Sequence, residues 1–402
     1  MRLPLVPAPS APLALGLLLF LSACADSEPQ PTTVTEVTEP TAFVTSATLN
    51  GSSHKVTSEP VLAGYQNHYQ LEMFGTAVPT VGDPMLGIRA AEAEAIGRLD
   101  TFLASGAYAA GARAAVSTVG GVGMIGGRTA SVLPSGAAAL TAKEPAKATA
   151  KLVEQAKRQL ARGLKVNPYS DNPLLQERLN RAAWAVGAGG ARMPRLDIRS
   201  PGFEAGVWPD LIGLRGLGVA AMENHPDRLQ TWNEDTLRNM GIDGALSAAF
   251  LSNRHLTPVQ ATIITQGLAR IPARGRRVVF EYAAEADDPA DGLFLQMMVQ
   301  MAFGYHTRLS GLTEIIQVSG LPIFYNEKGD VVLLLPVDRL PWTAEIRGIL
   351  DAVSGPMRTR RQIDEIEVWL TGKASATALA ESRLRRAKLF EDSAKFLLAP
   401  ER

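Results

Sequence analysis

Residues 292–305 read GLFLQMMVQMAFGY, and as a helix this stretch would be apolar on nearly every side. A helix with that pattern is surrounded by other elements, because a surface helix keeps one polar face. Its 14 residues are fewer than the roughly 20 that cross a bilayer, and Gln296 and Gln300 interrupt it. The stretch therefore predicts a buried helix at the centre of a globular core.

Short apolar runs on either side of the helical part of the chain predict strands. Residues 313–336 follow the buried helix and predict a β-meander, in which the NEKGD sequence at 326–330 forms a hairpin turn. Further strands are expected near 43–81, including 43–49 and 69–74. Because the strands are grouped at the two ends and helices lie between them, we expect a mostly helical α+β fold with short antiparallel strands.

Proline after a capping residue marks several helix starts. Asp83-Pro84 and Asn172-Pro173 predict an N-cap followed by Pro at the first helical position. Thr257 and Gln260 have the spacing of a capping box. Helices are expected at 84–104, 147–164, from 173, 208–223, 226–240, from 258 to 271, 341–353, 359–371 and 375–398, while 278–280 fits a short strand or a helix start.

The N-terminus has the features of an export signal. An apolar run over 13–21, too short to span a bilayer, ends in Leu21-Ser22-Ala23-Cys24. The L-S-A-C string resembles the lipobox of bacterial lipoproteins. The resemblance implies that residues 1–23 are a removed signal peptide and that Cys24 carries fatty acyl chains such as palmitate. Ala25, rather than Asp, follows that cysteine, which implies the outer membrane, facing the periplasm.

The rest of the chain divides by composition. Residues 24–42 are rich in Pro, Thr and Glu and predict a flexible tether. A mixed α+β body is expected over 43–372 and a C-terminal helix over 373–402. Residues 105–142, inside the body, are rich in Ala and Gly. They predict a flexible or closely packed segment, with a membrane-touching hairpin as the alternative.

Charge and cysteine content exclude several classes of protein. The chain has 40 basic and 40 acidic residues, so it lacks the positive charge typical of a nucleic-acid-binding protein. Its one cysteine excludes an internal disulfide framework and a multi-cysteine metal site. We therefore expect no nucleic-acid partner and no bound metal.

Catalytic and cofactor motifs are absent or incomplete in the sequence. Residues 121–126 match G-x-G-x-x-G, but Pro134 and Gly136 interrupt the helix that a dinucleotide site requires. Neither H-E-x-x-H nor G-x-S-x-G occurs. We therefore expect no cofactor and no catalytic set. His225, His255 and His306 remain as candidate ligand contacts.

The most distinctive string is KVNPYSDNPLL at 165–175. It resembles an N-P-Y-x-x-N-P-x-L segment of bacterial proteins that have no established activity, so the resemblance implies no catalytic residues. Two prolines and two cap-forming residues predict a rigid corner between helices. Tyr169 in this corner is either a packing anchor or a ligand contact.

These features together predict a lipid-anchored cell-envelope protein. Its membrane partner is reached through Cys24, and its body is expected to be a non-enzymatic binding or scaffolding module in the periplasm, with a possible envelope protein partner. One alternative is an envelope hydrolase whose site is assembled from dispersed residues such as His255 or His306. The other is a membrane-engaging protein that uses residues 105–142.

Overall fold

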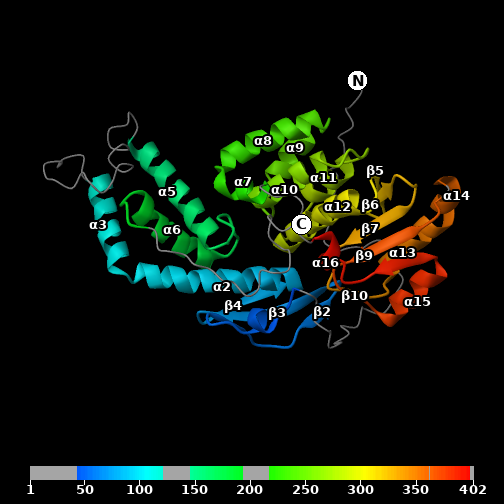
Figure 1. Ribbon diagram of the computed structural model, residues 1–402, viewed down its shortest axis with the longest axis horizontal. Coiled ribbons are helices and arrows are strands. Elements are labelled where there is room, and N and C mark those ends of the chain that lie inside the picture. The colour runs from blue at the N-terminus through cyan, green and yellow to red at the C-terminus, as the bar shows by residue number, and fades with distance from the viewer. Residues whose placement is uncertain (1–42, 121–144, 193–216, 362, 399–402) are drawn as a thin grey trace, which may run out of the picture.

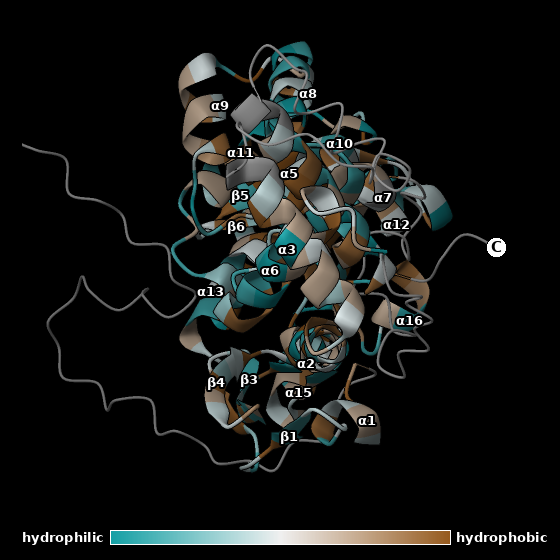
Figure 2. Cartoon of the chain, turned by 90° about the vertical axis from the view of Figure 1, so that its left-hand side faces the viewer, coloured by the Kyte–Doolittle hydropathy of each residue, from teal (hydrophilic) through white to brown (hydrophobic). Residues whose placement is uncertain are grey.

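The computed structural model describes residues 43–120, 145–192, 217–361 and 363–398 (Figure 1). Within them the fold is mostly helical with several small sheets, which confirms the predicted α+β class. The long helix α2 (Asp83–Leu103) runs beside the N-terminal sheet, and other helices lie above its start (Figure 1). Figure 2 looks along α2, with β1, β3 and β4 below it and the hydrophilic helix α8 at the outside.

The N-terminal sheet is built around one central strand. β3 (Gln66–Met73) pairs antiparallel with β1 (His54–Val56), β2 (Val61–Ala63) and β4 (Thr76–Val81). Alternate residues of β3 are buried, which is the pattern of a strand with one face on the core. The predicted strand at 43–49 is wrong. Thr45 instead caps the short helix α1 (Ser46–Leu49) through a capping box.

Helix α2 packs on this sheet together with two later helices. Its apolar face joins β3, α5 (Pro145–Gly163) and α6 (Pro173–Gly187) in one buried cluster, which includes Leu71, Ile96, Leu160 and Leu179. Helix α3 (Gly106–Gly120) packs against α6. Asn172 caps α6 with Pro173 at the first position, as predicted.

A second and larger cluster joins the remaining helices to the C-terminal sheet. The buried helix is confirmed: α12 (Pro289–Arg308) is enclosed from Gly292 to Tyr305. Residues 278–280 belong to a helix. The other helices of this cluster are α7 (Leu217–Glu223), α8 (Pro226–Asn239), α9 (Gly244–Leu251), α10 (Pro258–Ala269), which has the predicted capping box at Thr257, and α11 (Arg277–Ala284).

The predicted meander forms three strands of a five-stranded sheet. β5 (Leu312–Val318), β6 (Leu321–Asn326) and β7 (Val331–Leu335) pair antiparallel. β9 (Ile366–Leu370) then pairs with β7, and β11 (Ala387–Phe390) with β9, both in parallel. The other C-terminal elements are β8 (Arg339–Leu340), α13 (Ala344–Ala352), the π-helical turn η2 (Val353–Met357), α14 (Arg358–Arg361), β10 (Lys373–Ala374), α15 (Ala376–Leu384) and α16 (Ala394–Leu397).

Two predicted C-terminal helices are therefore wrong. The expected helix at 359–371 contains β9, and the expected helix at 375–398, the core of the predicted C-terminal helix at 373–402, is divided into α15, β11 and α16. Arg386 and Asp392 have φ angles of 56° and 52°, in the left-handed region where a helix cannot continue. The chain therefore turns at each of these residues.

Several predictions lie outside the described residues. These include the signal peptide at 1–23 with Cys24, the tether at 24–42, the G-x-G-x-x-G match at 121–126 and most of the helix expected at 208–223. Of the segment at 105–142, residues 106–120 form helix α3. Among the described residues, no helix is both long enough and apolar enough to span a membrane.

Candidate functional site

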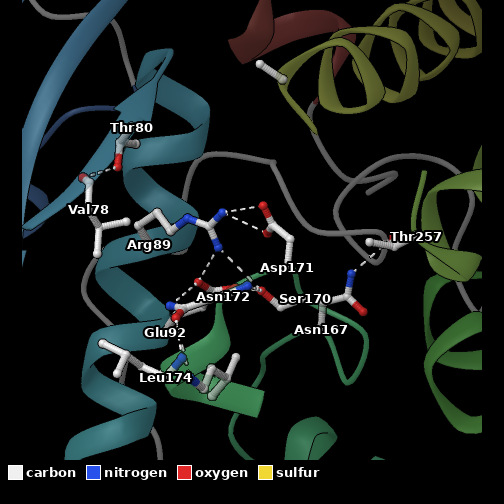
Figure 3. A network of polar contacts seen from close by, with 12 residues as sticks. Val78, Thr80, Arg89, Glu92, Asn167, Ser170, Asp171, Asn172, Leu174 and Thr257 are labelled. Carbon is white, nitrogen blue, oxygen red and sulfur yellow. Dashed lines mark hydrogen bonds and ion pairs between the residues drawn. The ribbon is translucent and has the colours of Figure 1, made fainter. Parts of the chain in front are cut away.

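An ion-pair network, buried at Arg89 and Glu92 and exposed at Asp171, joins helix α2 to the 165–175 corner (Figure 3). The Arg89 guanidinium lies 2.7 Å from Glu92 Oε2 and 2.7 and 2.8 Å from the two carboxylate oxygens of Asp171. Arg89 and Glu92 are 7% and 1% exposed. Burial by itself lowers the pKa of Arg89, but the two carboxylates outweigh it and raise the pKa, so the guanidinium stays charged.

The same carboxylate fixes the corner itself. Ser170 Oγ donates to Glu92 Oε1 and accepts a hydrogen bond from the backbone N–H of Asn172. Asn172 Nδ2 donates to Glu92 Oε2 at 2.9 Å, while its Oδ1 caps α6 by accepting from Leu174 N at 3.0 Å. Glu92 therefore accepts hydrogen bonds from Arg89, Ser170 and Asn172, and this network compensates its buried charge.

A pocket of about 80 Å³ opens beside this network, where four segments meet. Glu92 comes from α2, Ser170 and Asp171 from the corner, His255 from the α9–α10 loop and Gln296 from α12. The remaining lining residues are Met85, Ile88, Asn167, Arg254, Thr257, Val259, Gln260, Pro289 and Leu293. A hydrogen bond of 3.3 Å between Asn167 Nδ2 and Thr257 Oγ1 joins the corner to the start of α10 (Figure 3).

Two polar groups of the pocket have unused hydrogen-bonding capacity. Gln296 is 5% exposed, and its Nε2 donates to Gln300 Oε1 at 3.3 Å. Its Oε1 has no hydrogen-bond partner among the described residues. The exposed Arg254 donates through Nε to His255 Nε2 at 3.0 Å and forms no ion pair within the described part of the chain. The free acceptor of Gln296 and the free guanidinium N–H groups of Arg254 can therefore hydrogen-bond to a ligand or to water in the pocket.

The structure brings only His255 of the four predicted contacts into this pocket. Tyr169 is half-buried against the core, with its hydroxyl 3.4 Å from Asn224 O, and burial raises its pKa. His225 caps α8 by accepting from Asp227 N at 3.3 Å. His306 Nδ1 accepts from Leu312 N at 2.9 Å, and burial lowers its pKa. These three side chains support the packing of the fold.

Three polar residues that line the pocket, Gln296, Glu92 and Arg254, were not among the predicted contacts. Gln296 was interpreted as an interruption of an apolar helix, although a buried amide in such a helix needs a partner. Glu92 has the appearance of an ordinary helix residue. Arg254 precedes His255, and an Arg-His pair before a capping box could have indicated a polar loop.

A second buried polar cluster lies at the first turn of α2. Asp338 Oδ2 accepts from the backbone N–H groups of Asn67 and Asp83 at 2.8 and 3.0 Å. Asp83 Oδ1 accepts from Tyr69 Oη at 2.5 Å and from Asn67 Nδ2 at 2.8 Å. Asp83 is therefore not the predicted N-cap; Gly82 occupies that position, with φ of 91°. Burial, and then the charge of Asp83, raise the pKa of Asp338 well above its usual range.

A further cavity of about 280 Å³ lies between the N-terminal sheet and the start of α12. Its acidic residues support that helix: Asp288 Oδ1 accepts from Ala290 N at 2.6 Å, and Asp291 Oδ2 accepts from Asp287 N at 3.2 Å. Burial raises the pKa of Asp291 to about 6. Since these carboxylates satisfy the helix start, their presence is explained without a ligand.

No His, Cys, Asp and Glu side chains form a group of three or more suited to a metal ion in the parts of the chain that the structure describes. Comparison with protein-family models, curated proteins and solved structures found no match to this chain.

Proposed function

We propose that this chain is a lipid-anchored protein of the bacterial cell envelope whose body binds a small molecule, without catalysis. The observation that carries the proposal is the pocket in which the distinctive 165–175 corner meets His255. A concave site with a few convergent polar groups and an apolar wall is the usual form of a small-molecule site. The Cys24 lipid proposed from the lipobox resemblance would hold this pocket close to a membrane surface.

The contacts of Ser170 favour binding over hydrolysis. Its hydroxyl donates to Glu92, whose charge is balanced by Arg89, so Glu92 is poorly suited to remove the hydroxyl proton. His255, the available base in the pocket, is hydrogen-bonded through Nε2 to Arg254 and not to Ser170. A serine hydrolase requires its base to contact the nucleophile.

The binding part of the proposal can be tested by filling the pocket. Ile88 lines it from the half-buried side of α2, so Ile88→Trp should fill the space while leaving the core intact. We expect small metabolites presented as a mixed set to be retained by the full chain in native mass spectrometry and to be lost from this variant. Thr101→Trp, at an exposed position of the same helix, is the matched control. Equal retention by both variants, or none by the unmodified chain, would refute the proposal.

The anchor has its own test. Intact-mass analysis of the protein from bacterial membranes should show a chain that begins at Cys24 and carries diacylglycerol and acyl mass. Cys24→Ala should release the protein from the membrane fraction. An unmodified thiol in a processed chain would contradict the anchor and leave the pocket proposal standing.

A further inference from the structure

The pocket beside the corner presents groups of opposite character to a bound molecule. Gln296 Oε1 is an acceptor on a side chain only 5% exposed, without a hydrogen-bond partner in the described ranges. This acceptor faces the pocket, so the pocket favours a molecule that brings an N–H donor to it. Arg254 presents guanidinium N–H groups that no carboxylate of the described chain occupies, and these favour an anionic oxygen.

The charges of the network point in the same direction. Arg89 carries one positive charge between two carboxylates, Glu92 and Asp171. The trio therefore keeps one net negative charge, and both carboxylate residues line the pocket. Arg254, on the neighbouring segment, supplies the opposite sign. A site with separate negative and positive groups is complementary to a dipolar molecule rather than to a plain cation or anion.

The size of the pocket and its apolar wall narrow the class of molecule that it can bind. The pocket encloses about 80 Å³, and Met85, Ile88, Val259 and Leu293 form an apolar wall. We infer, on the basis of the proposed function, that the pocket binds a small α-amino acid with an apolar side chain. Its carboxylate would lie on Arg254, its ammonium group on Gln296 Oε1 and the Asp171 side of the network, and its side chain on the apolar wall.

The experiment compares three probes that differ in one charged group each. L-Alanine carries both groups, propionate lacks the ammonium group, and ethylamine lacks the carboxylate. Calorimetric titration of the full chain should give binding of L-alanine at least about tenfold tighter than that of either single-charge probe, since each charged hydrogen bond contributes that factor. Equal binding of all three probes would overturn the assignment.

Variants then assign each charged group to its residue. Arg254→Gln should weaken L-alanine and propionate about tenfold and leave ethylamine unchanged, since Arg254 contacts only the carboxylate. Gln296→Leu, similar in size, should weaken L-alanine and ethylamine and leave propionate unchanged. Because Arg254 is exposed, its variant stays folded even if the buried change at Gln296 does not. Arg270→Gln, an exposed arginine at the end of α10, should change nothing.

The outcomes separate this inference from the proposed function. Retention of other metabolites, abolished by Ile88→Trp but without preference for a zwitterion, would reject the amino-acid class and keep the binding function. Absence of any retained molecule would reject both. Equal effects of Arg254→Gln and Arg270→Gln would reject the role of Arg254.

Discussion

Helix α2 is held at two places by buried carboxylates, and the two places differ in the charged group that faces the carboxylate. In its middle, Glu92 is compensated by the guanidinium of Arg89. At its first turn, Asp338 accepts hydrogen bonds from the backbone N–H groups of Asn67 and Asp83, and the nearby Asp83 carboxylate raises the pKa of Asp338. The two carboxylates that face Arg89 raise the pKa of its guanidinium, whereas burial and the charge of Asp83 raise the pKa of Asp338 well above its usual range. The surroundings therefore favour the charged form of Arg89 at the first site and the protonated form of Asp338 at the second.

The largest loss of stability is expected where Arg89 compensates the buried charge of Glu92. Arg89→Leu leaves Glu92 buried without its cation, which should lower the free energy of unfolding by about 3–5 kcal/mol. Denaturant unfolding measures this value. Arg238→Ala, which breaks an exposed ion pair with Asp235, should cost less than about 1 kcal/mol. Similar losses in the two variants would show that burial does not distinguish these pairs.

Removal of the Asp338 carboxylate should have the next largest effect. Asp338→Ala leaves the backbone N–H groups of Asn67 and Asp83 without their acceptor. The expected loss is about 1–3 kcal/mol in denaturant unfolding. Because the acceptor joins segments far apart in sequence, hydrogen exchange at Asn67 should also accelerate. Unchanged exchange there would contradict the hydrogen bond.

The N-cap of α6 should contribute less to the free energy of unfolding. Asn172→Ala removes the acceptor for Leu174 N and the donor to Glu92, and we expect a loss of about 1–2 kcal/mol. Ser375→Ala removes a cap with no link to the network, on α15, and serves as the comparison. If the two caps cost the same, Asn172 contributes nothing through Glu92.

Asp338→Asn should change the free energy of unfolding least at acidic pH, and it tests the raised pKa of Asp338 most directly. The folded state binds the Asp338 proton more tightly than the unfolded state does. The free energy of unfolding therefore falls as the pH rises from the ordinary Asp range through the raised pKa. Asn keeps an acceptor and carries no charge, so this variant should match the unmodified chain in acid and exceed it in alkali. Parallel stability–pH curves would refute the raised pKa.

Local signals in the sequence were sufficient for most helix starts. Asn172 and Thr257 form the predicted caps, because a cap depends on residues within one turn. The helix at 292–305 was predictable from its uniform apolarity. The corner was predicted as a rigid junction, and its hydrogen bonds to Glu92 agree with that description.

Elements that depend on distant partners were not predictable in the same way. Ile366–Leu370 reads IEVWL and lies within the helix predicted at 359–371, but its β-branched and aromatic residues pair with β7, more than thirty positions earlier. The pocket was missed for a similar reason. Gln296 and Arg254 gain a common role only when α12 and the α9–α10 loop meet α2, and no spacing in the sequence reports that contact.

The hydrogen bond between Asn67 and Asp338 also determines when the N-terminal sheet of a newly made chain can finish folding. The two residues are 271 positions apart, so the N-terminal sheet cannot complete its attachment until most of the polypeptide has been synthesised. Contacts of such long separation slow the final assembly step. If the protein is exported as proposed, its first strands would remain in the periplasm with unpaired backbone groups until Asp338 arrives. A chaperone would be needed most during this interval.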